Sequence, residues 1–280
     1  MQFTVGMDVG SAAVKVVAFG ADRPLAWLQE PTSPSISRQC ARLLVDFLWA
    51  PALCGAGMMA VCSTGYGRNL ADAADAQVSE ILANALGAGW MWRNWDRLGS
   101  DNLGFGRPPH PARVGEPFRT IVDIGGQDSK VITFTPDGLV DQFAMNDRCA
   151  AGTGRFLEVM ARVLEADLAR LDALALSAAS PARISSTCTV FAESEVISLL
   201  AEGVGRGEVA AGVFQVVADR AADLARQVAW RPPVMFDGGP SHLGALRTAL
   251  AQALGCEVAV PPCAEFTTAL GAALFAAEPD

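Results

Sequence analysis

Residues 121–134 read Ile121-Val122-Asp123-Ile124-Gly125-Gly126-Gln127-Asp128-Ser129-Lys130-Val131-Ile132-Thr133-Phe134. Two β-rich runs flank a turn of small and polar residues, a pattern that predicts a β-hairpin with a polar tip. Residues 3–19 repeat the pattern: an Asp, a Gly two positions later, a small residue three positions later and a Lys seven positions later. These are Asp8, Gly10, Ser11 and Lys15 in the first copy, and Asp123, Gly125, Gly126 and Lys130 in the second. The chain therefore contains an internal duplication.

Each hairpin tip carries groups that bind nucleotide phosphates. Backbone N–H groups freed by glycine or serine can surround phosphate oxygens, a carboxylate can hold Mg²⁺ through water, and lysine adds positive charge. One copy alone is more simply read as a plain turn, because Asp and Gly are common turn residues. The duplication favours the nucleotide interpretation. The sequence has no Gly-x-x-x-x-Gly-Lys-Ser/Thr stretch, and no Gly-x-Gly-x-x-Gly follows the first strand, so the site is neither a P-loop nor a dinucleotide fingerprint.

Strands alternate with helices through both halves of the chain, which predicts an α/β protein with a cleft between two related domains. We expect domain I over residues 1–118, completed by a C-terminal helix within 265–280, and domain II over 119–264. The hydrophobic patterning predicts helices over 40–49, 79–87, 208–228, 243–254 and 267–277, a strand ending in a Gly-rich turn over 58–68, a strand running into a Gly-Gly turn over 231–240, and a short strand over 256–260.

Two cysteines lie where helices are expected to begin. Apolar residues recur at helical spacing after Cys149, which predicts a helix that starts at this cysteine, and a second helix is predicted from Cys188 to a stop at Gly203 and Gly205. A thiol at a helix N-terminus is shifted towards thiolate, the form that binds metal. Two cysteines are half of the four-thiolate set of an iron–sulfur cluster, and a twofold dimer would supply the rest. The alternative is that both are small buried hydrophobes, as most free cysteines are.

The stretch 89–119 contains Trp90, Trp92, Trp95 and Phe105 together with several prolines, and shows no period. It predicts a long loop. Exposed aromatic residues would make the loop a docking surface. Aromatics packed on one another would make it an Ω-like loop instead.

Composition narrows the classes of partner. The 280 residues are 51% hydrophobic and 18% charged, which is typical of a globular protein rather than a disordered one. A net charge of −9 disfavours nucleic acid and anionic membranes as partners. No apolar run is long enough to span a bilayer and no leader pattern opens the chain, so we expect a cytoplasmic location. Seven cysteines without framework spacing predict reduced thiols, of which Cys40, Cys54, Cys62, Cys256 and Cys263 are read as structural.

Together these stretches resemble the BadF/BadG/BcrA/BcrD ATPase family. Its members activate 2-hydroxyacyl-CoA dehydratases or drive ATP-dependent benzoyl-CoA reductases, within the acetate/sugar kinase–Hsc70–actin superfamily. The resemblance implies two actin-like (RNase H-like) domains with a nucleotide cleft between them. It is carried by Met7-Asp8-Val9-Gly10-Ser11, Thr64-Gly65-Tyr66-Gly67-Arg68, the stretch from Asp123 to Lys130, Asn146-Asp147-Arg148-Cys149-Ala150-Ala151-Gly152-Thr153-Gly154-Arg155-Phe156-Leu157-Glu158 and Cys188-Thr189-Val190-Phe191-Ala192-Glu193-Ser194-Glu195-Val196-Ile197.

The resemblance further implies an ATP-driven electron carrier. One 4Fe-4S cluster would be shared by a homodimer, each subunit would bind ATP/ADP with Mg²⁺, and a low-potential donor such as ferredoxin or flavodoxin would supply the electron. The acceptor would be a partner iron–sulfur dehydratase or reductase. Carried over by motif, the site residues are Asp8 and Asp123 for Mg²⁺; Gln127 for the attacking water; Gly10, Ser11, Lys15, Gly125, Gly126 and Lys130 for the phosphates; Gly152, Thr153, Gly154, Gly238 and Gly239 lining the nucleotide; and Cys149 and Cys188 as iron ligands.

Three other functions fit parts of the pattern. A small-molecule kinase of the same superfold would use the hairpins equally well, but it needs no paired cysteines. A cluster-bearing sensor would bind nucleotide without turnover. An ATPase subunit of a benzoyl-CoA reductase-like complex would pair with a non-identical relative.

Overall fold

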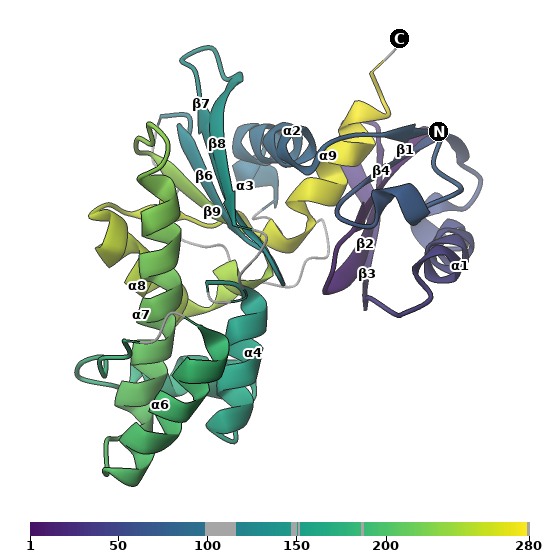
Figure 1. Ribbon diagram of the computed structural model, residues 1–280. Helices are drawn as coiled ribbons and strands as arrows, with labels where there is room; N and C mark the ends of the chain where they lie inside the picture. The colour runs from purple at the N-terminus through teal and green to yellow at the C-terminus, as the bar shows by residue number, and fades with distance from the viewer. Residues whose placement is uncertain (99–115, 147–149, 151, 186–187, 279–280) are drawn as a thin grey trace. The chain divides into compact units, whose positions relative to one another are not determined.

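The structure is a computed structural model that describes residues 1–98, 116–146, 150, 152–185 and 188–278 (Figure 1). Its contacts divide the chain into two compact units. Unit 1 consists of Met1–Arg113 with Pro261–Asp280, and unit 2 of Val114–Val260. The sequence-based domain boundaries at residues 118 and 264 lie a few positions further along the chain. Each unit is built on a sheet of five strands.

The sheet of unit 1 has the strand order β3-β2-β1-β4-β5. The first three strands are antiparallel and form consecutive hairpins, whereas β4 and β5 run parallel to β1. The central strand β1 is buried from Phe3 to Val9, as expected of a strand covered on both faces. The strands are β1 Gln2–Val9, β2 Ala13–Gly20, β3 Arg23–Pro31, β4 Gly57–Thr64 and β5 Ala76–Gln77.

Helices cover this sheet, and the C-terminal helix α9 (Thr267–Phe275) packs on β1, β2, β4 and α2. The approach is close enough to require glycine on the strand, because a Cβ atom at Gly6 would lie 1.9 Å from the carbonyl oxygen of Ala269. The C-terminal helix is thus part of unit 1. The other helices of unit 1 are α1 Ile36–Leu48, α2 Glu80–Arg93 and α3 Trp95–Leu98, with 3-10 turns at Pro51–Leu53, Arg68–Leu70 and Ala264–Phe266.

The prediction of a long loop over residues 89–119 was wrong for residues 89–98. Helix α2 continues to Arg93 and α3 follows, so that Trp90, Trp92 and Trp95 are buried at 8%, 4% and 5% exposure. Gly87, where the predicted helix ended, is required by packing, since a Cβ atom there would lie 1.9 Å from the carbonyl oxygen of Thr267. Tertiary contact thus outweighs the weak helix propensity of glycine. The remainder of the predicted loop, including Phe105, falls largely outside the described residues.

Unit 2 repeats the strand order of unit 1. Its sheet runs β10-β9-β6-β7-β8, in which β6, β7 and β8 form antiparallel hairpins and β9 and β10 run parallel to β6. Strand β6 therefore corresponds to β1, β7 to β2 and β9 to β4, and the predicted internal duplication is confirmed. The strands are β6 Thr120–Ile124, β7 Ser129–Phe134, β8 Val140–Asn146, β9 Val234–Asp237 and β10 Val258–Ala259.

Of the two helices predicted to begin at cysteines, one begins where expected and the other begins five residues later. Helix α6 begins directly after Cys188, as predicted. Helix α4 begins at Gly154 rather than at Cys149, because Gly152 has a left-handed φ of +94° and Thr153 is extended. Cys149 itself lies outside the described residues. The helices of unit 2 are α4 Gly154–Val163, α5 Leu168–Leu176, α6 Thr189–Ala201, α7 Arg206–Ala225 and α8 Gly244–Leu254, with a 3-10 turn at Gly239–His242.

The helices of the described ranges are too short or too polar to span a membrane.

Candidate functional site

Three side chains form a row across the sheet of unit 1. Asp8 on β1 lies opposite Lys15 on β2 and opposite Thr64 on β4. Residues in register on neighbouring strands share a face of the sheet, so the three side chains lie together. The Nζ atom of Lys15 lies 3.1 Å from Oδ2 of Asp8, which is only 6% exposed. The hairpin therefore holds its carboxylate as a buried, neutralised ion pair at the end of the strand.

The backbone of a glycine packs closely against the carboxylate of Asp8. Gly65, which follows Thr64, has φ +91°, and a Cβ atom there would lie 2.7 Å from Oδ1 of Asp8. The tip of the hairpin is held by the amide of Gly10, which donates to the carbonyl of Ala13 at 3.1 Å. The hydroxyl of Thr32 donates to the carbonyl of Gly10 at 2.7 Å. The tip residues Gly10 and Ser11 remain partly exposed, so their backbone can reach a ligand.

Unit 2 contains the corresponding row with one change. Asp123 on β6 lies opposite Lys130 on β7 and opposite Asp237 on β9. The Nζ atom of Lys130 lies 3.3 Å from Oδ2 of Asp123 and 2.6 Å from Oδ2 of Asp128. Asp237 is 1% exposed. Sequence reasoning assigned no role to Asp237, and its only local signal is its place at the end of a strand before two glycines.

Gly238 follows this row and corresponds to Gly65 of unit 1. Gly238 has φ +87°, and a Cβ atom there would lie 2.2 Å from the carbonyl oxygen of Ile124 and 2.6 Å from Oδ1 of Asp123. Gly65 and Gly238 thus hold the same position against the same carboxylate oxygen in the two units. The neighbouring Gly239 is exposed, and a Cβ atom there would have no atom within 4 Å, so its backbone stays accessible.

The start of α4 is tied to the second hairpin by three hydrogen bonds. The amide of Gly154 donates to the carbonyl of Gly125 at 2.9 Å, and the amide of Arg155 donates to that of Gly126 at 2.8 Å. The hydroxyl of Ser129 donates to the carbonyl of Gly152 at 2.5 Å. The structure therefore brings the predicted Gly125, Gly126 and Gly152–Gly154 segments together. The amide of Gly154 is already used in the bond to Gly125, so Gly154 connects α4 to the second hairpin.

Two further predicted residues belong to these segments or adjoin them. Thr153 is fully buried and its hydroxyl donates to the carbonyl of Ala150 at 2.6 Å, so it fixes the turn before α4. Gln127 lies at the tip of the β6–β7 turn and is exposed, which leaves its amide available to solvent and ligands.

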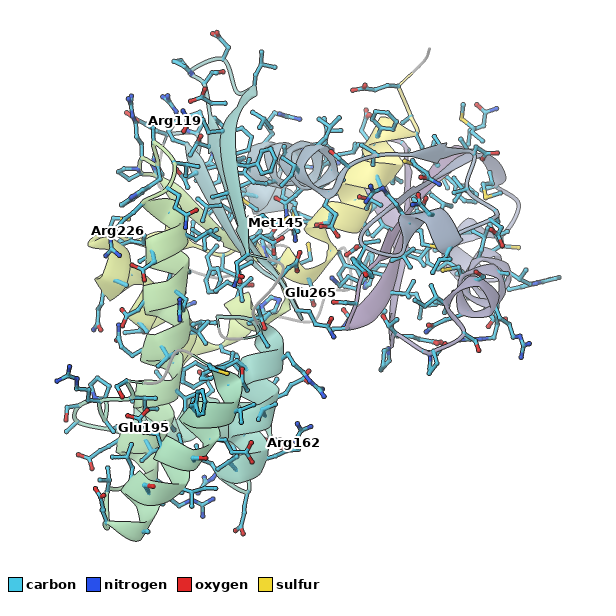
Figure 2. All side chains as sticks on the ribbon, in the orientation of Figure 1. Arg119, Met145, Arg162, Glu195, Arg226 and Glu265 are labelled. Atoms are coloured by element: carbon cyan, nitrogen blue, oxygen red, sulfur yellow. The ribbon has the colours of Figure 1, made fainter. Side chains whose placement is uncertain are left out.

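The described cysteines differ in exposure: Cys54 is exposed, as is Cys188, and Cys256 is partly buried. Cys40, Cys62 and Cys263 are buried, and burial raises the pKa of Cys62 to about 11. Cys188 is exposed and occupies the N-cap position of α6. The segment before it is fixed to α6, because the carboxylate of Glu195 (labelled in Figure 2) accepts from the amide and hydroxyl of Ser185 at 2.8 and 2.9 Å. A buried thiol suits packing, whereas the thiol of Cys188 is open to a ligand.

Comparison with known proteins identifies the relatives of this chain. The sequence profile of the BadF/BadG/BcrA/BcrD ATPase family matches residues 110–276. The (R)-2-hydroxyglutaryl-CoA dehydratase activating ATPase of Acidaminococcus fermentans is 38% identical over 275 residues, covering 98% of this chain and 96% of that protein. This chain belongs to the BadF/BadG/BcrA/BcrD ATPase family.

Other relatives of this family member are named for related roles. The activator of lactoyl-CoA dehydratase from Anaerotignum propionicum is 41% identical, covering 99% of this chain and 98% of that protein. A benzoyl-CoA reductase subunit of Thauera aromatica is 28% identical, with 99% and 94% covered. The similarity thus extends to both branches that the sequence motifs indicated.

Solved structures confirm the predicted fold class of two actin-like α/β domains. The activator of the 2-hydroxyisocaproyl-CoA dehydratase from Clostridium difficile with bound ADPNP gives a TM-score of 0.83 at 35% identity, covering 98% of this chain and 94% of that one. A ROK family glucokinase from Streptomyces griseus gives 0.56 at 14% identity, covering 99% and 100%, and shares the fold alone.

The charges of this family member suit a metal ion that arrives with a nucleotide. In the part of the chain that the structure describes, no group of three His, Cys, Asp or Glu side chains is arranged to hold a metal. Asp123 and Asp237 instead lie side by side on parallel strands. Mg²⁺ keeps several of its waters and is commonly held by one or two carboxylates together with substrate phosphates. The donor set therefore fits Mg²⁺ bound through water and phosphate.

Proposed function

We propose that this protein is an ATP-dependent reductive activator. It hydrolyses ATP and passes a low-potential electron, received from a donor such as ferredoxin or flavodoxin, to a partner iron–sulfur enzyme of the 2-hydroxyacyl-CoA dehydratase type. The observation that carries the proposal is the exposed thiol of Cys188 at the start of α6, in a chain that also holds two nucleotide-type hairpins. Phosphoryl transfer by a small-molecule kinase of this fold does not require that thiol.

The hairpins support the ATPase part of the proposal. In it, Asp8 and Asp123 position Mg²⁺ through its waters, and Gln127 orients the attacking water. The buried ion pairs with lysine hold both carboxylates in one conformation, which suits water-mediated metal binding. The residues that bind the phosphates are Gly10, Ser11, Lys15, Gly125, Gly126 and Lys130. Those that line the nucleotide are Gly152, Thr153, Gly154, Gly238 and Gly239.

The cysteines support the electron-transfer part. Cys149 and Cys188 of two copies would supply the four thiolates that a 4Fe-4S cluster takes. The fit of Cys188 is chemical: its sulfur is exposed at the N-cap position of α6, and cysteine sulfur is the ligand that iron–sulfur clusters take. When bound, the cluster supplies one-electron redox chemistry. Helix α6 also exposes Val190, Phe191 and Ile197, apolar side chains that a contact between copies would bury.

The link between the second hairpin and α4 offers a route for coupling. The amides of Gly154 and Arg155 and the hydroxyl of Ser129 join the phosphate hairpin to the segment that follows Cys149. A movement of the hairpin on ATP binding or hydrolysis would be passed to this cysteine. Solvent exposure and hydrogen bonding around a cluster set its reduction potential, so such a movement would change the potential.

The test is the iron and acid-labile sulfide content of the anaerobically purified protein, with Cys149→Ala and Cys188→Ala alongside. We expect about four irons per dimer, lost in each variant, with Cys256→Ala as a control that keeps them. Absence of iron after reconstitution would refute the electron-carrier function and leave a kinase or nucleotide switch. Stable co-purification with a non-identical relative would instead favour the benzoyl-CoA reductase-like alternative, which the 28% identity to the Thauera aromatica protein supports.

A further inference from the structure

We propose that the hydroxyl of Thr64 binds an oxygen atom at the phosphate end of the nucleotide, belonging either to a phosphate group or to a water on its magnesium ion. The inference rests on the proposed ATPase function and deepens it. It assigns a ligand in unit 1 to a residue outside the two phosphate hairpins.

The first observation is an unsatisfied hydroxyl. Thr64 is fully buried, and its Oγ1 has no hydrogen-bond partner among the described residues. Other buried threonines of the same unit are satisfied: Thr4 donates to the carbonyl of Ala273 at 2.7 Å and Thr267 to that of Ala264 at 3.0 Å. Burial of an unpaired hydroxyl is unfavourable and uncommon in folded proteins. A partner from outside the chain would satisfy it.

The second observation is the position of this hydroxyl. Thr64 lies opposite Asp8 in the parallel pairing of β4 with β1, so its side chain belongs to the row that contains Asp8 and Lys15. The adjacent residue Ser63 faces the opposite side of the sheet, where its hydroxyl donates to the carbonyl of Arg68 at 3.1 Å. The unpaired hydroxyl therefore lies on the face of the proposed nucleotide site.

The third observation is the contrast between the two copies of the duplication. Unit 2 carries Asp237 at the position that Thr64 holds in unit 1. In unit 2, Lys130 contacts the carboxylates of Asp123 and Asp128, and a third carboxylate, Asp237, lies opposite Asp123 on the next strand. In unit 1, Lys15 balances Asp8, and a neutral hydroxyl completes the row. A hydroxyl can donate to an oxygen of an anion that a second carboxylate would repel.

The experiment compares threonine variants of one sheet. Thr64→Val removes the hydroxyl and keeps the shape, Thr64→Ser keeps the hydroxyl, and Thr4→Val is the control that removes a satisfied hydroxyl on the neighbouring strand. Affinity for ADPNP is measured by calorimetry with Mg²⁺ and with EDTA, and thermal melting is measured without nucleotide.

We expect Thr64→Val to weaken Mg·ADPNP binding about tenfold, as loss of one hydrogen bond to a charged group predicts, and to melt no lower than wild type without nucleotide. Thr64→Ser should bind within about threefold of wild type, by the same reasoning on a retained hydrogen bond. Thr4→Val should melt lower and bind normally. A loss that persists in EDTA identifies a phosphate oxygen as the partner, and one that disappears identifies a metal-bound water.

Two results would overturn the inference alone. Wild-type affinity in Thr64→Val is one. The other is a nucleotide-free Thr64→Val protein that melts as low as Thr4→Val, which would show that the hydroxyl has a structural partner. A wild-type protein that binds no nucleotide would overturn both the inference and the proposed function.

Discussion

Replacement of Gly238 by alanine should both destabilise unit 2 and impair nucleotide hydrolysis. Gly238 has φ +87° and ψ 169°, a region of backbone space that is essentially reserved for glycine. Holding alanine there costs about 1–3 kcal/mol. The new Cβ atom would also lie 2.2 Å from the carbonyl oxygen of Ile124 and 2.6 Å from Oδ1 of Asp123, so backbone and carboxylate must move. Forced shifts of this kind cost about another 1–3 kcal/mol.

The sum is a loss of roughly 4 kcal/mol in the free energy of unfolding of unit 2. Two other glycines of unit 2 allow the cost of the backbone conformation to be measured apart from the cost of the close contacts. Gly255 has φ +69° with no atom within 4 Å of a Cβ position, so Gly255→Ala should cost only the left-handed conformation, about 1–2 kcal/mol. Gly239 has neither a positive φ nor a close neighbour, so Gly239→Ala should be nearly neutral for stability.

The assay is urea unfolding of the three variants, followed by Mg²⁺-dependent ATP hydrolysis of those that remain folded at the assay temperature. Gly238→Ala should lose hydrolysis because Asp123 is displaced, whereas Gly255→Ala should retain it. If Gly238→Ala is no less stable than Gly255→Ala and hydrolyses ATP normally, then the glycine does not shape the carboxylate site and the reasoning fails.

Two further predictions address coupling and pH. Ser129→Ala removes the hydrogen bond to the carbonyl of Gly152. We expect ATP hydrolysis to stay within about threefold of wild type, and the nucleotide-dependent change in cluster potential, measured by redox titration with and without ATP, to become smaller. An unchanged shift in potential would exclude coupling through this hydrogen bond. Burial raises the pKa of Cys62 from 9.0 to about 11, so the folded state ionises later than the unfolded chain. The stability that the protonated Cys62 thiol contributes is complete below pH 9 and is lost as pH rises towards 11. In Cys62→Ala, the free energy of unfolding should therefore fall less steeply between pH 9 and 11. An equal slope in both proteins would contradict the raised pKa of Cys62.

Features that depend on neighbouring residues were predictable from the sequence. In each hairpin a short turn fixes the register, so Asp8 had to face Lys15 and Asp123 had to face Lys130. The helix after Cys188 was likewise predictable, because its capping residues and its glycine stop signal are local. The duplication was visible for the same reason, since it is a repeat of local patterns.

Features that depend on distant segments required the structure. The positions of Thr64 and Asp237 opposite the two hairpin aspartates follow from parallel pairing, which joins strands far apart in the chain and leaves no local signal. Helix α2 extends past Gly87 because α9, about 180 residues later, packs against that glycine. Helix α4 begins at Gly154 because its first amides bond to the β6–β7 turn rather than continue a helix back to Cys149.

The sequence by itself determined the duplicated hairpins, the aspartate and lysine that each one carries, and the family to which the chain belongs. Only the tertiary structure decided which residue completes each row, a hydroxyl in unit 1 and a carboxylate in unit 2. The physical reason is that hairpin register is set by a turn of a few residues, whereas the third member of each row is brought in by a parallel strand whose register is set by packing of the whole sheet.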